Sequence, residues 1–346
     1  MSTTSTVEAR EFSPLRTLQR LNPYHWSVGL VMRGMAQLLI ADHLVAGPRT
    51  AAELAAAIDA HPPSLARFLR ACVLHGLVTP AEGDRFALTE DGHLLRSDVP
   101  SLRGFIIAVN SPGMTRPWEL IADVVRTGQP ATEAAWGTDH WSYYAANPEE
   151  GRCYAETFIA LSVEVAAALH ASYDLTQIGS IVDVGGAPGA TLVELLDRNP
   201  GCRAVLLDLP WAIPYTRELV ADRGLAHRVR IEEGDFFEQV PAGGDLYLLK
   251  NILCDLPDER AAQVLGRCAQ AGASGSTLLL VDWENVPSTS HVHATDVEFM
   301  VLTGGRARTE AEYLQLLAQA GYAKTRRLPL VGHERAPFVL IEATHA

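Results

Sequence analysis

The sequence predicts a doubly wound α/β domain with a Rossmann-like sheet, preceded by a smaller all-α, winged-helix domain. From residue 178 onward, strand patterns alternate with helical patterns, as in proteins with parallel sheets. A glycine-rich turn that contains Gly185, Gly186 and Gly189 joins the first β-branched run to a helical pattern. Three short helical patterns and a small hairpin within residues 14–105 indicate the winged helix.

The elements of the N-terminal domain follow from apolar periodicity and from capping residues. Thr50 and Glu53 form a capping box at the start of the second helix, and Ser64 is a candidate cap for the third. The three helices, a turn and a short strand are predicted, in this order, over residues 28–40, 50–58, 63–75, 82–84 and 85–89.

The rest of the chain is predicted as a connector and an α/β domain. Residues 106–175 are mixed helix and loop and are expected to form part of a substrate pocket. Residues 176–346 form the Rossmann-like domain, with its ligand expected at the carboxyl ends of the strands. Its strands are predicted over residues 181–184, 204–207, 229–232, 245–249, 277–281 and 338–342.

Composition and charge exclude several classes of function. The net charge of −13 argues against a nucleic-acid partner, and no apolar run approaches the roughly 18–20 residues that span a membrane. Residues 1–13 are a polar, flexible lead-in without the apolar core of a signal peptide. The five cysteines are scattered and show no metal-ligand spacing. We therefore expect a cytoplasmic protein with reduced thiols and no metal.

The winged-helix domain also lacks the basic surface of a DNA reader. Residues 1–110 contain 10 Arg, no Lys and 10 acidic residues, so this part of the chain is neutral. Its helices are rich in Ala and Leu on more than one face, which favours burial against a second subunit. The expected partner of this domain is a second copy of the chain in a homodimer.

The glycine turn and one acidic residue predict the cofactor site. A strand, a tight glycine turn and a helix N-terminus allow the backbone to approach a bound cofactor closely. About 20 residues later, Asp208 ends a second apolar run, at the place where a ribose diol is bound. A carboxylate suits a diol because it accepts both hydroxyl protons.

Five sequence blocks together resemble the small-molecule S-adenosylmethionine-dependent O-methyltransferases of the caffeate and hydroxyneurosporene type. The resemblance extends from about residue 20 to the end, and 47–54 matches the dimerisation domain of that family. The blocks lie at residues 182–189, 207–210, 234–237, 249–259 and 302–310.

The resemblance implies roles for residues of the cofactor site. The three glycines of the turn would let the backbone reach the methionine end of S-adenosylmethionine. Asp208, followed by Leu209, would bind the ribose hydroxyls. Asp235 and Phe236 would contact the adenine, and Lys250 would contact the polar end of the cofactor.

The glycine turn and the catalytic positions depart from the family pattern. Ala187 and Pro188 stand where the family has Gly-His or a similar pair. The family's general base, a histidine, is replaced by Cys254. A supporting Glu falls near Trp283, with acidic residues on either side at 282 and 284, and a second supporting Glu is replaced by Ala307.

The loss of the base matters because a phenol has a pKa of about 10, and a positioned base contributes about 10²–10⁴-fold to the rate. The candidate catalytic residues are Cys254, Asp255 and His140, with His291 and His293 as further candidates. Cys254 is also interpreted as a small residue that lines the pocket. The candidate substrate contacts are Phe158, Ser162, Trp283, Met300 and Arg306.

Three functions remain open at this point. In the first, the enzyme methylates a small, largely apolar aromatic or polyketide-type metabolite by proximity and orientation, without the usual base. In the second, bound S-adenosylmethionine is a fixed positive charge for a hydroxylase-, cyclase- or pericyclase-like reaction. In the third, the chain is a ligand-binding or regulatory protein without catalysis. The family resemblance favours the first.

Overall fold

The structure, a computed structural model, describes residues 26–99, 101–286, 290–331 and 338–345. The chain divides into two compact units, Met1–Asn110 and Ser111–Ala346. The predicted lead-in over residues 1–13 lies outside the described residues.

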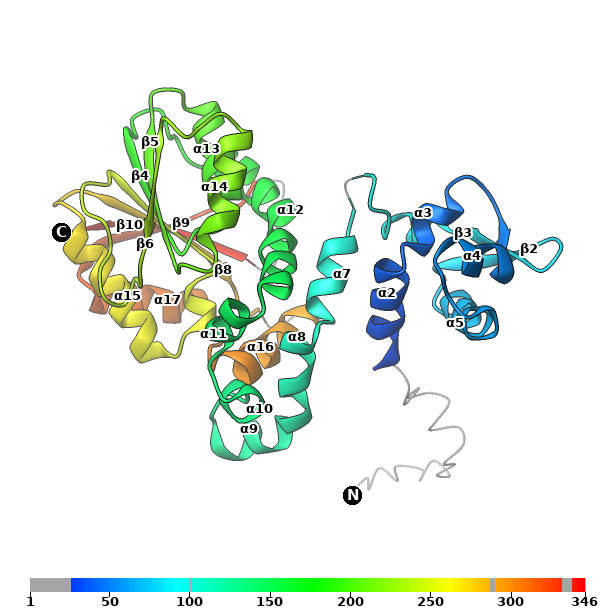
Figure 1. Cartoon of the computed structure of the whole chain (residues 1–346). Helices are drawn as coiled ribbons and strands as arrows, with labels where there is room; N and C mark the ends of the chain where they lie inside the picture. Colours follow the sequence, from blue (N-terminus) through cyan, green and yellow to red (C-terminus); the bar gives the residue numbers. More distant parts are fainter. Residues whose placement is uncertain (1–25, 100, 287–289, 332–337, 346) are drawn as a thin grey trace, which may run out of the picture. The chain divides into compact units, whose positions relative to one another are not determined.

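The N-terminal unit has the helices and the hairpin of a winged helix (Figure 1). The strands form a small antiparallel sheet in the order β1-β3-β2. The predicted capping box is present, because the Glu53 amide donates to Thr50 Oγ1 over 3.2 Å and the Thr50 amide donates to Glu53 over 2.7 Å. The elements are α2 (Ser27–Gln37), α3 (Ile40–Leu44), β1 (Arg49–Thr50), α4 (Ala51–Ala57), α5 (Pro62–Leu74), β2 (Val78–Ala81), β3 (Arg85–Leu88), α6 (Glu90–His93) and α7 (Arg103–Val109).

Two predictions for this unit were wrong. The helix expected over residues 28–40 is two helices, because Leu39 takes a left-handed φ of 53° between α2 and α3. The break buries Ile40 completely. Ser64 does not cap α5; the cap position is His61, and Ser64 Oγ lies 3.0 Å from the Nδ1 atom of its ring.

The second unit begins with helices that precede its sheet. They are α8 (Pro112–Thr115), η1 (Arg116–Leu120), α9 (Ile121–Thr127), α10 (Thr132–Trp136), α11 (His140–Ala146) and α12 (Pro148–Ser172). Helix α12 is long and apolar enough to cross a membrane by length and composition alone. Val165, Ala166 and Leu169 on this helix are nevertheless buried in the core of the sheet domain, which accounts for its apolar composition.

A seven-stranded sheet forms the centre of the second unit, in the order β6-β5-β4-β7-β8-β10-β9. Strands β6, β5, β4, β7 and β8 pair in parallel, as predicted. The later elements are β4 (Ser180–Val184), α13 (Ala190–Arg198), β5 (Arg203–Asp208), α14 (Ile213–Asp222), β6 (Val229–Glu233), β7 (Leu246–Lys250), η2 (Leu253–Asp255), α15 (Asp258–Ala271), β8 (Thr277–Trp283), α16 (Ser290–Leu302), α17 (Glu310–Gln319), β9 (Tyr322–Leu328) and β10 (Phe338–His345).

The sheet departs from the prediction at its last two strands. β10 pairs antiparallel with both β8 and β9, and β9 was not predicted. An edge strand needs little apolar sequence, and the central residues of β9 are exposed and largely charged. Arg326 on β9 pairs with Glu342 on β10 over 2.7 Å, which fits their opposed positions in the register.

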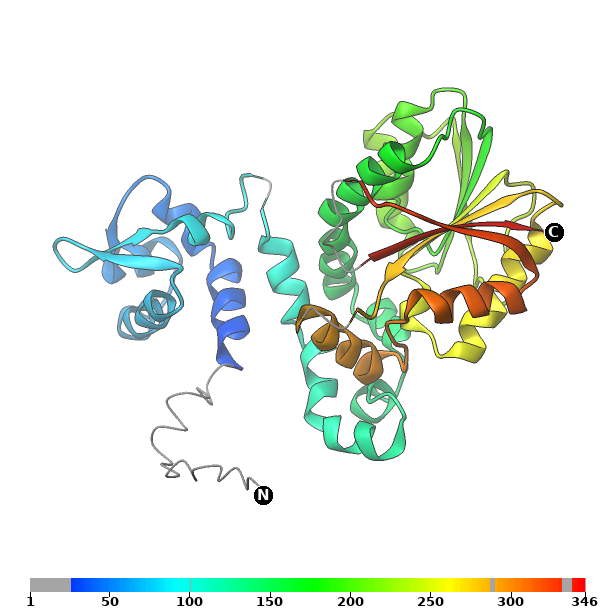
Figure 2. The same ribbon diagram turned by 180° about the vertical axis from the view of Figure 1, so that it is seen from behind.

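Helices cover both faces of this sheet, as Figures 1 and 2 show. Side chains from α12, α13 and α14 form one core with the strands, and side chains from α15 and α17 form the other. This is a doubly wound arrangement, in which ligands bind outside the carboxyl ends of the parallel strands.

Candidate functional site

The predicted cofactor residues lie at or just after the carboxyl ends of four parallel strands. β4 pairs with β5 on one side and with β7 on the other, so the chain changes direction between β4 and β7. A topological switch point of this kind creates the ligand crevice of open α/β sheets. The glycine turn follows β4, Asp208 ends β5, Asp235 follows β6 and Lys250 ends β7.

The glycines of the turn are required by its geometry. Gly185 has a φ of 71°, and a Cβ atom there would lie 2.6 Å from Ile252 Cδ1. A Cβ atom on Gly186 would lie 2.2 Å from the carboxyl carbon of Asp183. Gly189 has a φ of 92° at the N-cap of α13. Side chains larger than glycine therefore do not fit at Gly185 and Gly186, and the turn leads directly to the N-terminus of α13.

Asp208 is fixed against the glycine turn by two backbone hydrogen bonds. Its Oδ2 accepts from the Ala187 amide over 2.9 Å, and its Oδ1 accepts from the Leu209 amide over 2.7 Å. Burial raises the pKa of Asp208 to about 6, against the lowering effect of these two bonds. Each carboxylate oxygen keeps a lone pair for a further donor, as the predicted contact with ribose hydroxyls requires.

Asp183 is a site residue that the sequence interpretation missed. It is 2% exposed, and its Oδ2 has no hydrogen-bond partner among the described residues. Burial raises its pKa to about 7, and the Lys250 ammonium acts in the opposite direction. Burial lowers the pKa of Lys250, and Asp183 opposes that shift. A lone acidic residue inside an otherwise apolar strand was the signal that could have revealed it.

The predicted adenine contacts lie on the loop after β6. Asp235 accepts a 2.7 Å hydrogen bond from the Phe237 amide, which fixes the turn. The Phe236 ring lies 3.3 Å from the position of a Cβ atom on Gly185 and packs edge-on against Phe237. The structure therefore brings the aromatic side chain predicted for the adenine beside the first glycine of the turn.

The segment that contains Cys254, the predicted replacement of the family's base, is held by a buried acid. The carboxylate of Asp282, which is 0% exposed, accepts from the amides of Leu253 and Cys254 over 2.9 and 3.2 Å. It also accepts from the amide of Trp283 over 2.8 Å. Glu284, on the other side of Trp283, instead pairs with Arg327 over 2.6 Å. Asp282 is thus the acid that positions the Cys254 segment.

The Cys254 thiol is in an environment that keeps it neutral. Its side chain is 1% exposed, and burial raises its pKa well above the usual value. The neighbouring carboxyls of Asp282 and Asp255 raise it further, while Arg308 has a smaller opposite effect. Because the thiolate is the reactive form of cysteine, this position does not offer a ready base or nucleophile at neutral pH.

Aromatic side chains surround the remaining candidate, His140. Its ring lies 5.0 Å from Tyr144 and 5.7 Å from Tyr154, edge-on in both cases. Tyr144 stacks on Tyr154 at 4.6 Å and lies 5.6 Å from Trp211, which follows the Asp208 segment. Burial lowers the pKa of His140 to about 4, so its imidazole is neutral at pH 7. Its Nδ1 atom has no partner among the described residues.

Three other predicted substrate contacts are described. Ser162 is 3% exposed on α12, Met300 packs in a small apolar cluster beside Tyr154, and Trp283 ends β8. The side chain of Phe158 lies outside the described part of the structure.

Arg306 and the other histidines are not brought into this group. Arg306 pairs with Asp258 over 3.0 Å and with Glu312 over 2.8 Å, at a partly exposed position. His293 is exposed, and the side chain of His291 is outside the described residues. We therefore retain His140 alone among these candidates.

Comparison with known proteins gives the family. Residues 118–323 match the model of an O-methyltransferase domain, and residues 25–98 match that of an O-methyltransferase dimerisation domain. The chain belongs to the O-methyltransferase family. Enzymes of this family use S-adenosylmethionine, which is the cofactor of this O-methyltransferase.

The relatives include two different activities. O-demethylpuromycin-O-methyltransferase of Streptomyces alboniger is 35% identical over 85% of this chain and 80% of its own length. Aclacinomycin 10-hydroxylase of Streptomyces purpurascens is 33% identical over 85% of this chain and 81% of its own length. An O-methyltransferase from neocarzinostatin biosynthesis, solved with S-adenosylmethionine and 2-hydroxy-5-methyl naphthoic acid, is 30% identical, with a TM-score of 0.79 and coverage of 97% and 100%.

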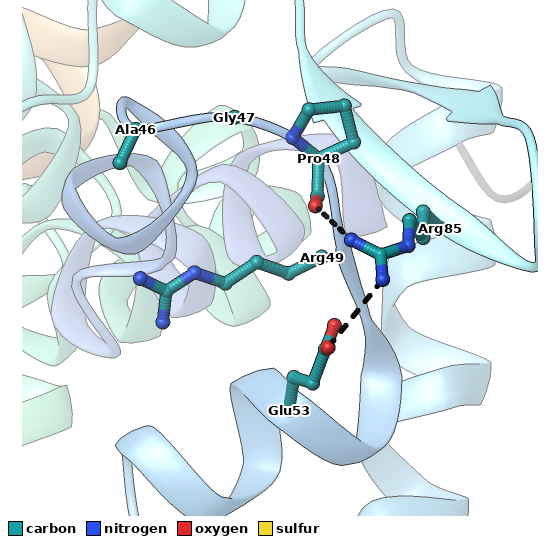
Figure 3. A pocket seen from close by; sticks show the side chains of 6 residues that line it. All are labelled: Ala46, Gly47, Pro48, Arg49, Glu53 and Arg85. Atoms are coloured by element: carbon teal, nitrogen blue, oxygen red, sulfur yellow. Dashed lines mark hydrogen bonds and ion pairs between the residues drawn. The ribbon is translucent and has the colours of Figure 1, made fainter.

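The N-terminal unit of this O-methyltransferase contains an open hollow of about 480 Å³ (Figure 3). Arg85 spans it, donating to the Pro48 carbonyl over 3.1 Å and pairing with Glu53 at 3.7 Å. Glu53 also belongs to the capping box of α4. These contacts stabilise the start of the helix, so we assign the hollow no part in the chemistry.

The replacement Asp208→Ala tests the cofactor assignment. We expect the affinity for S-adenosylmethionine to fall by about 1–3 kcal/mol, because charge-assisted hydrogen bonds are lost. In the wild type, the affinity should also fall as the pH drops through about 6, because the protonated carboxyl accepts fewer hydrogen bonds. Calorimetry between pH 5 and 8 measures both effects, and wild-type affinity in the variant would exclude this role for Asp208.

Proposed function

We propose that this O-methyltransferase methylates a hydroxyl group of a small, largely apolar aromatic or polyketide-type metabolite without a protein base. One contrast carries the proposal: the cofactor cluster is assembled, whereas Cys254 is buried beside carboxyls that keep it neutral. Orientation alone is a large effect, since well-positioned intramolecular reactions reach effective molarities of about 10⁵–10⁸ M. The names of the puromycin and neocarzinostatin relatives support the substrate class.

The residues at the carboxyl ends of the parallel strands fit S-adenosylmethionine. The glycine turn carries no side chain at Gly185 and Gly186, where a Cβ atom would clash. The orphaned Oδ2 of Asp183 needs a partner that a bound polar group would provide. When bound, the cofactor supplies a methyl group on a sulfonium centre. We assign its binding to Gly185, Gly186, Gly189, Asp208, Leu209, Asp235, Phe236 and Lys250.

The chain's own contribution to the reaction is placement of the acceptor. Ser162, Trp283 and Met300 are proposed to contact the substrate, together with Phe158. The buried imidazole of His140 is neutral, so we assign it a hydrogen bond to a substrate oxygen through Nδ1. A hydroxyl that is already acidic, as in a hydroxyquinone, would need no further activation.

A second function is kept because the Cys254 thiol does not offer a ready base. A relative named as a 10-hydroxylase shows that the family includes another activity. In that case the bound sulfonium would be a fixed positive charge beside a carbonyl oxygen. The two functions differ in whether the cofactor is consumed during turnover.

Replacing Cys254 by alanine tests whether the thiol is needed. We expect the methyl-transfer rate to stay within about tenfold of the wild type, since loss of a general base costs at least about 10². The backbone bond from residue 254 to Asp282 does not need the thiol. A loss above 100-fold at unchanged cofactor affinity would show that Cys254 is a base after all.

We also propose that the N-terminal unit forms a homodimer and that the protein is cytoplasmic, where its free cysteines stay reduced. The family model of this segment is a dimerisation domain, and large apolar side chains are exposed there. Leu30 on α2 is 42% exposed, and Phe105 on α7 is also 42% exposed. An obligate dimer would bury about 2,000 Å² or more.

Light scattering at micromolar concentration tests this assembly. The wild type is expected to be a dimer, and the pair of substitutions Leu30→Glu and Phe105→Glu is expected to give monomers, since charges are depleted from interface cores. Val125→Glu is the matched control, because Val125 is 70% exposed but lies in the other unit. A wild-type monomer would contradict the proposal.

A further inference from the structure

A second open hollow of about 380 Å³ lies at the amino ends of three parallel strands, and we call it the amino-end hollow. It is formed by residues on or beside the starts of β4, β5 and β6 and by the loop before β7. Arg203 begins β5 and Asp208 ends it, so about 16 Å of extended strand separates the hollow from the proposed ribose contact. The hollow is therefore not part of the cofactor crevice.

The amino-end hollow opens on a face of β5 and β6 that carries no helix. On the other face, Ala204 and Val229 belong to the core formed with α13 and α14 (Figure 1). Side chains alternate along a strand, so Val205 and Arg230 point to the opposite face. The described residues 234–245, which join β6 to β7, form no helix that could cover this face. The chain thus leaves an accessible surface beside the edge strand of the sheet.

The charged side chains of the amino-end hollow are all basic. Among the described residues that line it are Arg203, Arg228 and Arg230, together with His227, and no carboxylate. Ala204 pairs with Val229 in the parallel register, so Arg203 and Arg228 are neighbours across the two strands. Like charges on neighbouring strands are unfavourable. Their concentration is notable in a chain with 41 acidic and 28 basic residues, and it favours an anionic ligand.

Arg203 is the arginine of the hollow that the rest of the chain does not engage. The Arg228 guanidinium donates to three backbone carbonyls within residues 196–202, and Arg230 pairs with Glu232. The exposed side chain of Arg203 has no ion pair or hydrogen bond to any described residue. Its guanidinium therefore keeps its donors for a ligand, and such a planar group matches carboxylate and phosphate oxygens.

We propose that the amino-end hollow binds a small aromatic anion, with Arg203 as the contact to the charged group. Val182 and Val205 are direct neighbours on β4 and β5 and supply an apolar floor for the ring. A volume of about 380 Å³ lies within the range of small-molecule sites. An aromatic body is favoured over an aliphatic one because guanidinium groups also stack on ring faces. A cationic ligand would be repelled by the three arginines.

Fluorescence titration of the full-length protein with 8-anilinonaphthalene-1-sulfonate tests this proposal. N-phenyl-1-naphthylamine, which has the same rings without the sulfonate, is the neutral comparison. We expect Arg203→Gln to weaken binding of the sulfonate at least about threefold, as for loss of an exposed ion pair, and to leave the neutral probe unchanged. Val205→Trp fills the floor and should weaken both probes at least about tenfold, because the rings lose the apolar surface that they cover.

Arg198→Gln is the matched control for the loss of charge. It removes an exposed arginine of α13, which covers the other face of the sheet, and should change the binding of neither probe. Saturation with S-adenosylhomocysteine should also leave the affinity for the sulfonate unchanged, because the cofactor crevice lies at the other end of the strands. The affinity should fall as the ionic strength rises from about 0.01 to about 1 M, since salt screens exposed charges.

Each of these measurements can overturn the proposal. An unchanged affinity for the sulfonate in Arg203→Gln would do so, and because Arg203 is exposed, its replacement does not endanger folding. Equal affinity for the neutral and the anionic probe would show an apolar site without charge selection. Displacement of the sulfonate by S-adenosylhomocysteine would place the probe in the cofactor crevice instead. An affinity that does not depend on salt would contradict the role of the arginines.

Discussion

Replacing Gly305 by alanine is expected to destabilise the second unit by about 3 kcal/mol or more and to lower activity at least about 100-fold. A Cβ atom at this position would lie 2.0 Å from the Cys254 carbonyl oxygen and 2.5 Å from the Asp255 carbonyl carbon. The obstacle is backbone, so a side-chain rotation cannot relieve the clash.

The η2 segment has little freedom to move away. Asp282 accepts two of its amides, and Arg308 donates to the carbonyls of Leu253 and Leu256 over 2.5 and 2.6 Å. Each buried hydrogen bond that breaks costs about 1–3 kcal/mol. A shift of about 1 Å in the reacting groups costs about 10² in rate.

Thermal unfolding and methyl transfer measure the two effects of Gly305→Ala. At about 2–4 °C per kcal/mol for a unit of this size, the midpoint should fall by about 6–12 °C. Gly266→Ala is the control, because a Cβ atom on this helical glycine of α15 would meet nothing within 4 Å. That change should stabilise the protein by about 0.5–1 kcal/mol. Equal unfolding midpoints for the two variants would show that the η2 backbone can shift at little energetic cost.

The sequence predicted the parts of the fold that depend on local pattern. The central parallel strands are largely apolar runs. The glycine turn could be recognised because its backbone geometry requires glycine at several positions. β9 was missed because an edge strand can be charged, and the direction of β10 depends on how the chain returns after α17. The turn at Leu39 carried no glycine or proline signal.

For the candidate site, too, the sequence predicted what depends on local pattern and missed what depends on tertiary contacts. The place of Asp208 at the end of β5 could be predicted from the apolar run that precedes it. The replacement of the family's base by Cys254 stays a prediction from a local block. The contact between Asp282 and η2 joins segments 28 residues apart in sequence, and no local pattern encodes it.

The stoichiometry of the cofactor is expected to be one-to-one, with one S-adenosylhomocysteine released for each product molecule. Because Cys254 is buried and neutral, this is the deciding measurement for the proposed function. The enzyme is incubated with methyl-labelled S-adenosylmethionine and a panel of hydroxylated naphthalenes, phenols and hydroxyquinones. Chromatography then quantifies the cofactor, S-adenosylhomocysteine and the product from the same reaction.

The alternative function predicts a different balance from the same experiment. If the sulfonium were only a fixed charge, product would accumulate beyond the cofactor supplied and would carry no label. S-adenosylhomocysteine lacks that charge and would support far less turnover, because a well-placed charge in a site shielded from water stabilises a developing oxyanion by several kcal/mol. Methyl transfer, in contrast, stops when the cofactor is exhausted and is inhibited by S-adenosylhomocysteine. Unlabelled product formed over many turnovers on intact cofactor would therefore exclude methylation, and a labelled methyl group on every product molecule would exclude the fixed charge.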